Sequence, residues 1–440
     1  MNIDKIKQNQ NYILFTIILL SWSHQWLSIG SFINTTYRDF SLSSILAYRN
    51  QSLCIFAINA VIFIFDTKQN IKNRIFFYFF LIPIAYLFGL INFFIDTPSE
   101  QNIDFFYYLT FILQMINTLV ILNNFSKIDA LDKTIFLKIN LLLIFIYIII
   151  FFTSNNFYIL SNYYLNFSNI EIATNTNGIS RMLCMLNIFI TCHYFIKKNK
   201  FYLLILFIIN FLIMMLESRQ GLVLITVQLI LIIFYMHKKK GLIKKMSQYF
   251  LLLIIIPLCL VPFFKKNKFQ ENRLFILQGE LGHNRVQTKD DNRVETKDYN
   301  LIKLNDISTG RIDKWRIVSV HIINSKIKNI LFGNGPQFDR QIITTKGNDL
   351  ANGILYVFLC GGLLGLFSFF LIIKKILKII LYTFYNKTKL NTDVYLCFSV
   401  CCIISLTLRS LFENGFLFYS VDFLLITSSI FYLIKKLKLI

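Results

Sequence analysis

The side chains of this sequence that could do chemistry are arginines and carboxylates placed between long apolar runs. Three short junctions combine an arginine with an amide or a carboxylate: Asn177 with Arg181, Glu217 with Arg219, and Arg409 with Glu413. A guanidinium is a planar fork of donors that matches phosphate and carboxylate oxygens, and it keeps its charge near apolar surroundings. A nearby carboxylate can serve as a general base. These junctions therefore predict a site for an anionic substrate.

A fourth segment, "DISTGRIDKWRIVSVHII", carries Arg311 and predicts an amphipathic helix over 310–323. Ser308 and Thr309 suit its N-terminal cap, and Asp313 suits the positive end of its first turn. One face is apolar at helical spacing: Ile312, Trp315, Val318, Ile322 and Ile323. We expect this helix to lie on a membrane or to roof a bundle. The "LFGNGPQ" turn then ends it, and Asn352 stands where the next apolar run begins.

Each of these charges also has a purely structural interpretation. Glu217 is close enough in the sequence to neutralise Arg219, and Glu413 stands four residues after Arg409, the spacing of a helical ion pair. A single arginine at a helix end commonly anchors the helix at the interface, which is our interpretation of Arg38 and Arg49. Arginine-bearing junctions that all fall on one face favour a functional site, because charge at a membrane usually marks one.

The elements that must position these residues are membrane helices. Of 440 residues, 55% are hydrophobic, 16% aromatic and only 15% charged, with a mean hydropathy of +0.58. Such a chain has lipid as its solvent. The net charge of +22 first suggests nucleic acid, but the lysines sit in short clusters between apolar runs, where membrane topology explains them. We therefore expect no nucleic-acid partner.

The apolar runs predict an all-α polytopic membrane protein with about twelve spans of the length a bilayer requires. The runs lie near 12–32, 50–66, 75–95, 105–123, 138–154, 178–196, 201–217, 221–237, 249–264, 352–373, 394–410 and 415–434. Residues 154–177 leave room for an interfacial or re-entrant piece.

Lysines alternate along the connections between these runs. Every second connection contains them, in the segments 5–7, 68–72, 127–138, 197–200, 238–245, 374–389 and 435–438. The opposite short connections contain no lysine, and their cations are Arg38, Arg49, Arg181, Arg219 and Arg409. The positive-inside rule then places both termini in the cytoplasm and the long connection 265–351 outside. The expected parts are helices 1–9 in 1–264, the outer loop 265–351 (265–305 flexible, 306–351 partly helical) and helices 10–12 in 352–440.

All eight cysteines fall inside apolar runs, at 54, 184, 192, 259, 360, 397, 401 and 402. Their spacing indicates neither a disulfide framework nor a metal motif, and free cysteines of this kind behave as small core hydrophobes. We expect no metal and no cofactor.

Several short motifs resemble one family, the O-antigen polymerases and the related O-antigen ligases of bacterial surface polysaccharide assembly. They are "SRQG" at 218–221, "GR" at 310–311 with Trp315, "LFGNG" at 331–335 and "ANG" at 351–353, together with "NGISR" and "LRSLFE". The resemblance spans residues 173–435.

The resemblance implies a metal-independent glycosyl transfer at the periplasmic face of the bacterial inner membrane. The donor is a glycan on undecaprenyl pyrophosphate, and the family's functional arginines fall on Arg219 and Arg311. A polymerase adds the glycan to the sugar hydroxyl of a second repeat unit, and a chain-length regulator is a partner that the resemblance allows. Glu413, Glu217 and Asp313 are the candidate bases, and Glu413 is preferred. The catalytic set is then Arg219, Arg311 and Glu413; the substrate-binding set is Arg181, Arg409, Asn352, Asn177, Glu217 and Asp313.

Two alternatives remain open. A ligase would transfer the same glycan to the lipid A core, but ligases of this superfamily carry a functional histidine near the end of the long outer loop. Here "GNDLANG" fills that place, and His321 lies earlier, inside the predicted helix. A flippase for lipid-linked oligosaccharide would show internal repeats and charges near the bilayer midplane, and the sequence shows no convincing repeat.

Overall fold

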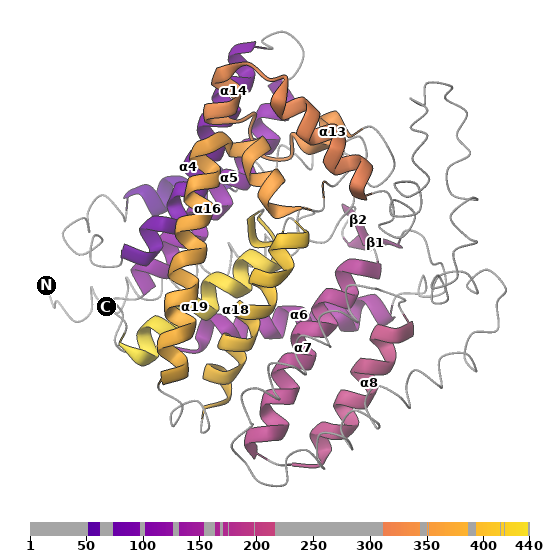
Figure 1. Cartoon of the computed structure of the whole chain (residues 1–440). Helices are drawn as coiled ribbons and strands as arrows, with labels where there is room; N and C mark the ends of the chain where they lie inside the picture. The colour runs from indigo at the N-terminus through magenta and orange to yellow at the C-terminus, as the bar shows by residue number, and fades with distance from the viewer. Residues whose placement is uncertain are drawn as a thin grey trace, which may run out of the picture.

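The computed structural model describes residues 52–61, 74–96, 102–125, 132–153, 163–167, 170–174, 176–197, 199–215, 311–343, 350, 352–385, 393–413, 415–417 and 419–438. Within these ranges the protein is helical, with eleven numbered α-helices (α4 to α8, α13 to α16, α18 and α19) and one two-stranded sheet. Figure 1 shows their arrangement. The predicted runs 12–32, 221–237 and 249–264 and the flexible part 265–305 lie outside the described residues.

The first half of the described chain forms helices where continuous apolar runs predict them. These are α4 (Arg74–Asp96), α5 (Asn102–Phe125), α6 (Ile135–Thr153), α7 (Thr176–Lys197) and α8 (Phe201–Met215), and residues 52–61 are helical too. Leucine, isoleucine and phenylalanine dominate α6 and α8, where no charged side chain interrupts the apolar surface beyond Lys138. Runs of this kind bury their backbone polar groups in helical hydrogen bonds, as a lipid solvent requires.

The second half contains the predicted amphipathic helix as α13 (Arg311–Ile323), followed by α14 (Ile327–Phe332) and α15 (Asp339–Ile342). The remaining elements are α16 (Gly353–Tyr385), α18 (Val394–Phe412), the 3₁₀ turn η5 (Gly415–Leu417) and α19 (Val421–Leu437). Local capping sets two of these starts: Asp393 accepts from the N–H groups of Tyr395 and Leu396 on α18, and Ser420 accepts from Phe423 N–H on α19.

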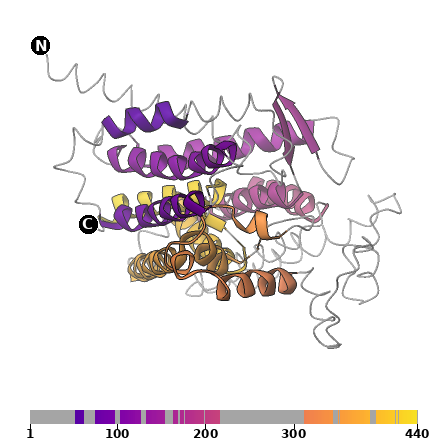
Figure 2. The same cartoon turned by 90° about the horizontal axis from the view of Figure 1, so that it is seen from above.

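Helices α18 and α19 lie in the middle of the bundle. Helix α18 contacts α7, α16 and α19, while α16 packs along α4 and α7 packs along α8. Figure 1 shows the α4–α16 pair and the α7–α8 pair on either side of this centre, and Figure 2 shows the helices stacked in layers. The bundle therefore brings helix ends that are far apart in the sequence to the same place.

The segment between α6 and α7 departs from a purely helical fold. Strands β1 (Tyr163–Phe167) and β2 (Ile170–Thr174) pair antiparallel, with Tyr163 opposite Thr174. Alternating apolar and polar residues in "YYLNF" and "IEIAT" suit strands better than a helix. The sequence allowed an interfacial or re-entrant piece in this segment, and the structure forms a β-hairpin there.

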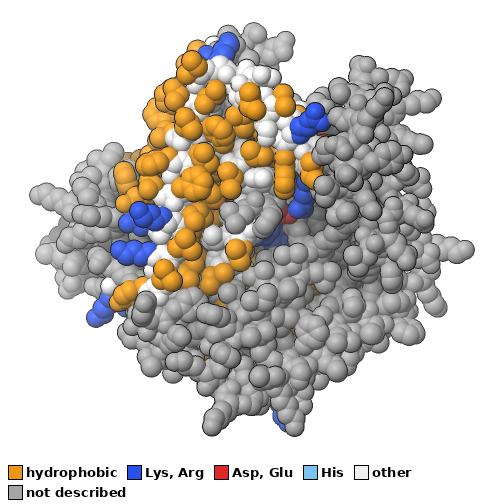
Figure 3. Space-filling view, viewed as in Figure 1, with side chains coloured by type: hydrophobic (Ala, Val, Ile, Leu, Met, Phe, Trp, Pro, Cys, Tyr) orange, Lys and Arg blue, Asp and Glu red, His pale blue; other side chains and the backbone are white. Residues whose placement is uncertain are grey.

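The described surface is apolar and the interior contains paired polar groups. Large hydrophobic side chains are exposed along α4, α6, α8 and α16. Figure 3 shows an apolar face over the region of α4 and α16, with Lys and Arg mainly at its edges. Inside, Asn187 donates to Asn210 (2.6 Å) and Asn140 donates to Ser428 (2.9 Å) between helices. Hydrogen bonds of this kind hold helices together where lipid provides no hydrophobic drive for association.

Among the described helices, two are long and apolar enough to cross a membrane, over Phe77–Ile95 and Gly353–Thr383. Shorter apolar helices cover Ser52–Val61, Tyr108–Asn123, Ile135–Ile146, Phe201–Ile213 and Val394–Ser410. The membrane character expected from composition therefore agrees with the structure at this coarse level.

Helix α16 is broken at Gly362, where φ is 61° and ψ is −157°. The break leaves two carbonyls of the first part without helical partners, and the turn after α14 supplies the donors. Asn334 N–H donates to Leu359 O (3.0 Å) and Gly335 N–H donates to Cys360 O (2.8 Å). An interrupted helix at membrane depth is tolerated when neighbouring groups satisfy its backbone in this way.

The "LFGNG" motif therefore has a structural function. Its Gly333 and Gly335 have φ of 78° and 86°, and their backbones lie directly against α16 and α4. A Cβ on Gly335 would meet Leu90 Cα at 3.0 Å. We expected this turn to end the amphipathic helix, but α13 ends at Ile323 and the turn ends α14 instead.

Replacing Gly362 by alanine is expected to destabilise the protein by at least about 2 kcal/mol, because φ of 61° is unfavourable for a residue with a Cβ. The Cβ would also contact Leu331 O and lie 2.6 Å from Gly333 N. Thermal unfolding in detergent measures the loss. Gly361→Ala is the matched control, since its Cβ meets side-chain atoms of Ala85 and Tyr86 at 3.3 Å. Equal losses for the two variants would contradict the explanation.

Candidate anion-binding site

Three predicted arginines and one predicted carboxylate meet at one end of the bundle. Arg181 comes from α7, Arg311 from α13 and Arg409 from α18, and Glu413 caps the C-terminus of α18. A fifth charge, Asp422 in the first turn of α19, completes the cluster. We call these five residues the charged cluster. Four helices that are separated in the sequence must pack correctly to assemble it.

Arg409 is the centre of the charged cluster. Its Nη1 donates to Asp422 Oδ2 and its Nη2 donates to Glu413 Oε2, so the two arms of one guanidinium hold two carboxylates. Arg409 has 7% of its side chain exposed and Asp422 has none. Charges buried this deeply are tolerated only when they are paired and hydrogen-bonded.

The other two arginines lie at the edge of the charged cluster. Arg311 Nη2 is 3.4 Å from Glu413 Oε1, and 35% of the Arg311 side chain is exposed. Arg181 Nη1 is 3.8 Å from Asp422 Oδ2, with 19% of the Arg181 side chain exposed. These longer and more accessible contacts can be exchanged for a ligand more easily than those of Arg409.

Helix α13 is held in place by contacts on its apolar face. Val318 is fully buried, Trp315 and Ile322 pack against the core, and Trp315 Nε1 donates to Leu350 O (3.0 Å). Leu350 N–H in turn donates to Asp339 Oδ2 (3.0 Å). The predicted stripe is therefore correct for these positions, whereas Ile323 is exposed. This anchoring brings Arg311, at the start of the helix, to Glu413.

The arginines lower the pKa of Glu413. Burial alone would raise it, but the charges of Arg409, then Arg181 and Arg311, outweigh burial and hold the pKa below its ordinary value. Glu413 is therefore an anion at neutral pH. A carboxylate stabilised in this way is a good counter-ion and a weak base.

The charged cluster favours an anionic ligand. Three guanidinium groups face two carboxylates, which leaves an excess of one positive charge. The N-terminus of α16 lies beside it, because Gly353 is in close backbone contact with Ser410 O, next to Arg409. A helix N-terminus carries partial positive charge and adds to the attraction. Since both carboxylates are already paired with arginines, a divalent cation would be repelled.

The remaining predicted residues divide into two groups. Arg219 and Glu217 lie outside the described residues, and so does the side chain of Asn177, whose backbone belongs to the first turn of α7. Asp313 lies exposed in the first turn of α13. Asn352 Oδ1 accepts from Leu355 N–H (3.1 Å), so this amide caps α16 beside the charged cluster. Sugar binding by Asn352 stays a prediction.

Asp422 is the residue that sequence reasoning missed. It stands in "YSVDFLL", as an acid at the start of an otherwise apolar run. A lone carboxylate in such a run is itself a signal, since it is costly in a membrane unless it has a partner. No arginine stands near Asp422 in the sequence. Its partners Arg409 and Arg181 are brought to it by the packing of α18 and α7 against α19.

His321 lies in a different environment from the arginines. Its ring packs against Phe338, with the ring centroids 5.6 Å apart, and partial burial lowers its pKa. It is therefore mostly neutral at pH 7.

Comparisons with known proteins add no family assignment. The sequence matches no protein-family model and no curated protein, and the structure matches no solved structure.

Proposed function

We propose that this chain is a multi-pass glycosyltransferase of the bacterial inner membrane that polymerises undecaprenyl-pyrophosphate-linked oligosaccharides into O-antigen or a related surface polysaccharide. The observation that supports it most is the convergence of Arg181, Arg311 and Arg409 around Glu413 and Asp422. This cluster combines an excess of positive charge with two accessible arginines, as a pyrophosphate site needs.

The proposed topology has about twelve spans, with both termini in the cytoplasm and the charged cluster on the periplasmic side. Pairing at the helix ends supports it. Arg181 and Arg409, both expected near the outer face, each contact Asp422. At the other end of α18, Lys436 lies 3.1 Å from Asp393 and Lys138 lies 6.0 Å from the Tyr395 ring centre. These lysines are the ones expected at the cytoplasmic face.

In the proposed reaction, an acceptor hydroxyl attacks the anomeric carbon of the donor glycan. A carbon–oxygen bond forms there, the bond from that carbon to the pyrophosphate oxygen breaks, and the hydroxyl proton passes to a base. The leaving lipid pyrophosphate carries the electron pair away as an anion. Arginines placed around that oxygen stabilise the developing charge, which lowers the barrier.

Arg311 is the proposed first contact with the pyrophosphate. Its bond to Glu413 is long and partly exposed, so a phosphate oxygen can replace the carboxylate while Arg409 still holds Glu413. Arg181 lies on the other side of Arg409 and can take a second oxygen. Arg219, from the resemblance, would add a further donor.

Glu413 suits the role of general base less well than the sequence suggested. Its lowered pKa suits a residue that positions Arg311 and Arg409. Asp313 is exposed two residues after Arg311 and is the better candidate for accepting the proton.

The position of His321 disfavours a ligase, which would need a histidine at its site. The His321 ring lies against Phe338, and Arg311 on the same helix pairs with the carboxylate of Glu413. We therefore propose a polymerase, and the pattern of surface glycolipid distinguishes it from a ligase and a flippase.

Deleting the gene and running the surface glycolipid on a gel tests the function. Loss of a polymerase is expected to leave a single repeat unit on the lipid A core. Loss of a ligase would leave bare core with polymer accumulating on its lipid carrier, and loss of a flippase would leave bare core with unpolymerised units trapped inside. Either of the last two patterns would overturn the proposal. Restoring the ladder with the wild-type gene is the control.

A further inference from the structure

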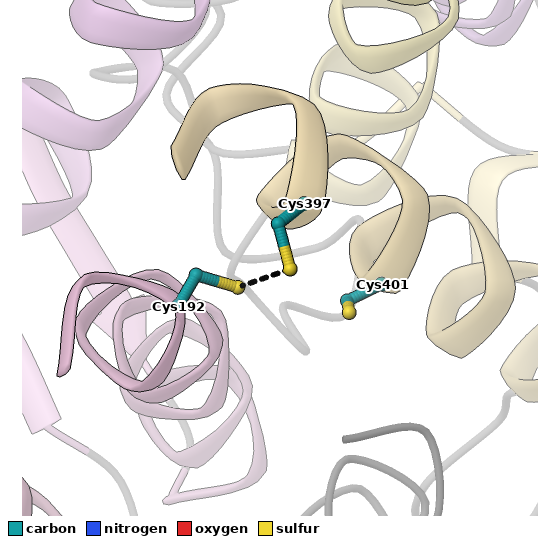
Figure 4. A group of neighbouring side chains, drawn as sticks. All are labelled: Cys192, Cys397 and Cys401. Carbon is teal, nitrogen blue, oxygen red and sulfur yellow. Dashed lines mark hydrogen bonds between the residues drawn. The ribbon is translucent and has the colours of Figure 1, made fainter. Parts of the chain in front are cut away.

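Three cysteine side chains converge at the other end of α7 and α18. Cys192 comes from α7, and Cys397 and Cys401 come from successive turns of α18, where residues four apart share a face. Their sulfur atoms all lie within 4.8 Å of one another, and all three residues are buried. Figure 4 shows Cys192 and Cys397 pointing toward each other, 3.5 Å apart at sulfur, with Cys401 beside them. We call this group the thiol cluster.

The thiol cluster is separate from the charged cluster. Arg181 and Cys192 are eleven residues apart on α7, and Arg409 and Cys401 are eight residues apart on α18. At the rise of an α-helix these separations correspond to roughly 12–16 Å along the helix axes. An ion bound by the thiol cluster therefore does not touch the charged cluster.

We propose that Cys192, Cys397 and Cys401 form a binding site for a soft, thiophilic metal ion, with Cu(I) as the best fit. Sulfur ligands at a bond length of about 2.3 Å stand roughly 4 Å apart around a three-coordinate ion. The observed sulfur separations, 3.5 Å for Cys192 and Cys397 and no more than 4.8 Å for any pair, match this within a small side-chain rotation. Thiolates select soft ions over Mg²⁺ or Ca²⁺.

The number of donors and the dry surroundings favour a univalent ion. Structural zinc takes four protein ligands, whereas three thiols converge here within the described residues. Binding releases thiol protons to solvent, and the site stays neutral when one proton leaves for each positive charge of the ion. Cu(I) therefore needs only one deprotonated thiol to keep the buried site uncharged, and Zn(II) needs two.

Packing alone does not account for the convergence. Cys184, Cys360 and Cys402 are also buried, and they fill space in the core as small hydrophobes are expected to do. Cys402 neighbours Cys401 on α18, yet it is not part of the thiol cluster. It provides a matched control with the same residue type, the same helix and the same burial.

The test uses the full-length protein in detergent, reduced with a phosphine under anaerobic conditions and carrying Cys54→Ser to remove an exposed thiol. Cu(I) is titrated against a chromophoric chelator. We expect one ion per chain, bound through sulfur by X-ray absorption spectroscopy. Cys192→Ser, Cys397→Ser and Cys401→Ser should each weaken binding at least about tenfold, whereas Cys402→Ser should bind as the parent does.

Folding is monitored in parallel, because a buried serine can destabilise a helix. Circular dichroism identifies a variant that does not fold, and Cys401→Ala then replaces Cys401→Ser. Cu(I) should also raise the unfolding temperature of the parent and of Cys402→Ser but not of the thiol-cluster variants.

Two outcomes would overturn the proposal. One is that the parent binds no Cu(I), or binds it as tightly after any thiol-cluster substitution. The other is a Cys192–Cys397 disulfide, found by mass spectrometry in protein isolated without reductant, together with no Cu(I) binding by the reduced protein. That result would make the cluster a redox pair.

Discussion

Replacing Arg311 by alanine is expected to leave the protein folded and inserted while it abolishes chain extension. Arg311 is partly exposed and its contact with Glu413 is 3.4 Å long, so its loss costs little stability. In the proposed reaction it binds the pyrophosphate and stabilises the leaving anion. Removing one such charged donor typically costs about 10²–10³ in rate. On a gel of surface glycolipid, a deletion strain carrying this variant should show the single repeat unit.

Arg316→Ala is the matched control, since Arg316 is exposed on the same helix five residues later. It should restore the full ladder. Arg311→Lys should restore it only poorly, because lysine is a point charge and lacks the planar fork that binds two phosphate oxygens. Immunoblotting of membranes confirms that each variant is inserted at the wild-type level. Full-length polymer in the Arg311→Ala strain would count decisively against the mechanism.

Replacing Arg409 by alanine has the largest expected effect on stability. Arg409 pairs with both Glu413 and Asp422, and its removal leaves Asp422, which has no exposed side chain, without its nearest partner. Breaking a buried ion pair from one side costs about 3–5 kcal/mol, because a charge remains buried and uncompensated. Thermal unfolding of the detergent-solubilised protein measures this loss, and activity should be lost with it.

The control uses another ion pair of α18, at its opposite end. Lys436 pairs with Asp393 at 3.1 Å but is 44% exposed, so Lys436→Ala should cost no more than about 1 kcal/mol. The double variant Arg409→Met with Asp422→Asn removes charge from both sides and should be more stable than Arg409→Ala. If Arg409→Ala were as mild as Lys436→Ala, the charged cluster would not be the buried network described above.

The charged cluster shows where sequence reasoning was sufficient and where it was not. Arg181, Arg311, Arg409 and Glu413 could be proposed as neighbours because each stands at a junction expected on the same face. Which of these charges pair could not be predicted from the sequence, because the pairing depends on α7, α13, α18 and α19 meeting at one end of the bundle. The role of Asp422 could not be predicted for the same reason: Arg409 stands thirteen residues earlier on α18, and Arg181 lies much earlier in the chain on α7.

The glycine-rich motifs illustrate a second limit. The "LFGNG" turn could be predicted as a turn, because glycine there permits positive φ. Nothing in the linear sequence indicates that its N–H groups would satisfy the carbonyls freed by the break at Gly362. The glycines of the turn and Gly362 are explained only by the contact between the backbone of the turn and the backbone of α16.

By itself the sequence determined the helical character of the chain, and it predicted a membrane environment and a side of the membrane for each charge, because apolar length and lysine placement are local properties of the chain. Helices α4 to α8 and α18 coincide closely with predicted runs, and α13 coincides with the predicted amphipathic helix. Helix α16 starts where a run was predicted but continues to Tyr385, past the predicted end at 373, and α14, α15 and the β1–β2 hairpin are not among the predicted runs. Only the tertiary structure decided which charges pair, which glycines touch and which cysteines converge. Those contacts depend on the packing of helices that are distant in the sequence. A helix has several faces, and the sequence does not indicate which neighbouring helix each face will contact.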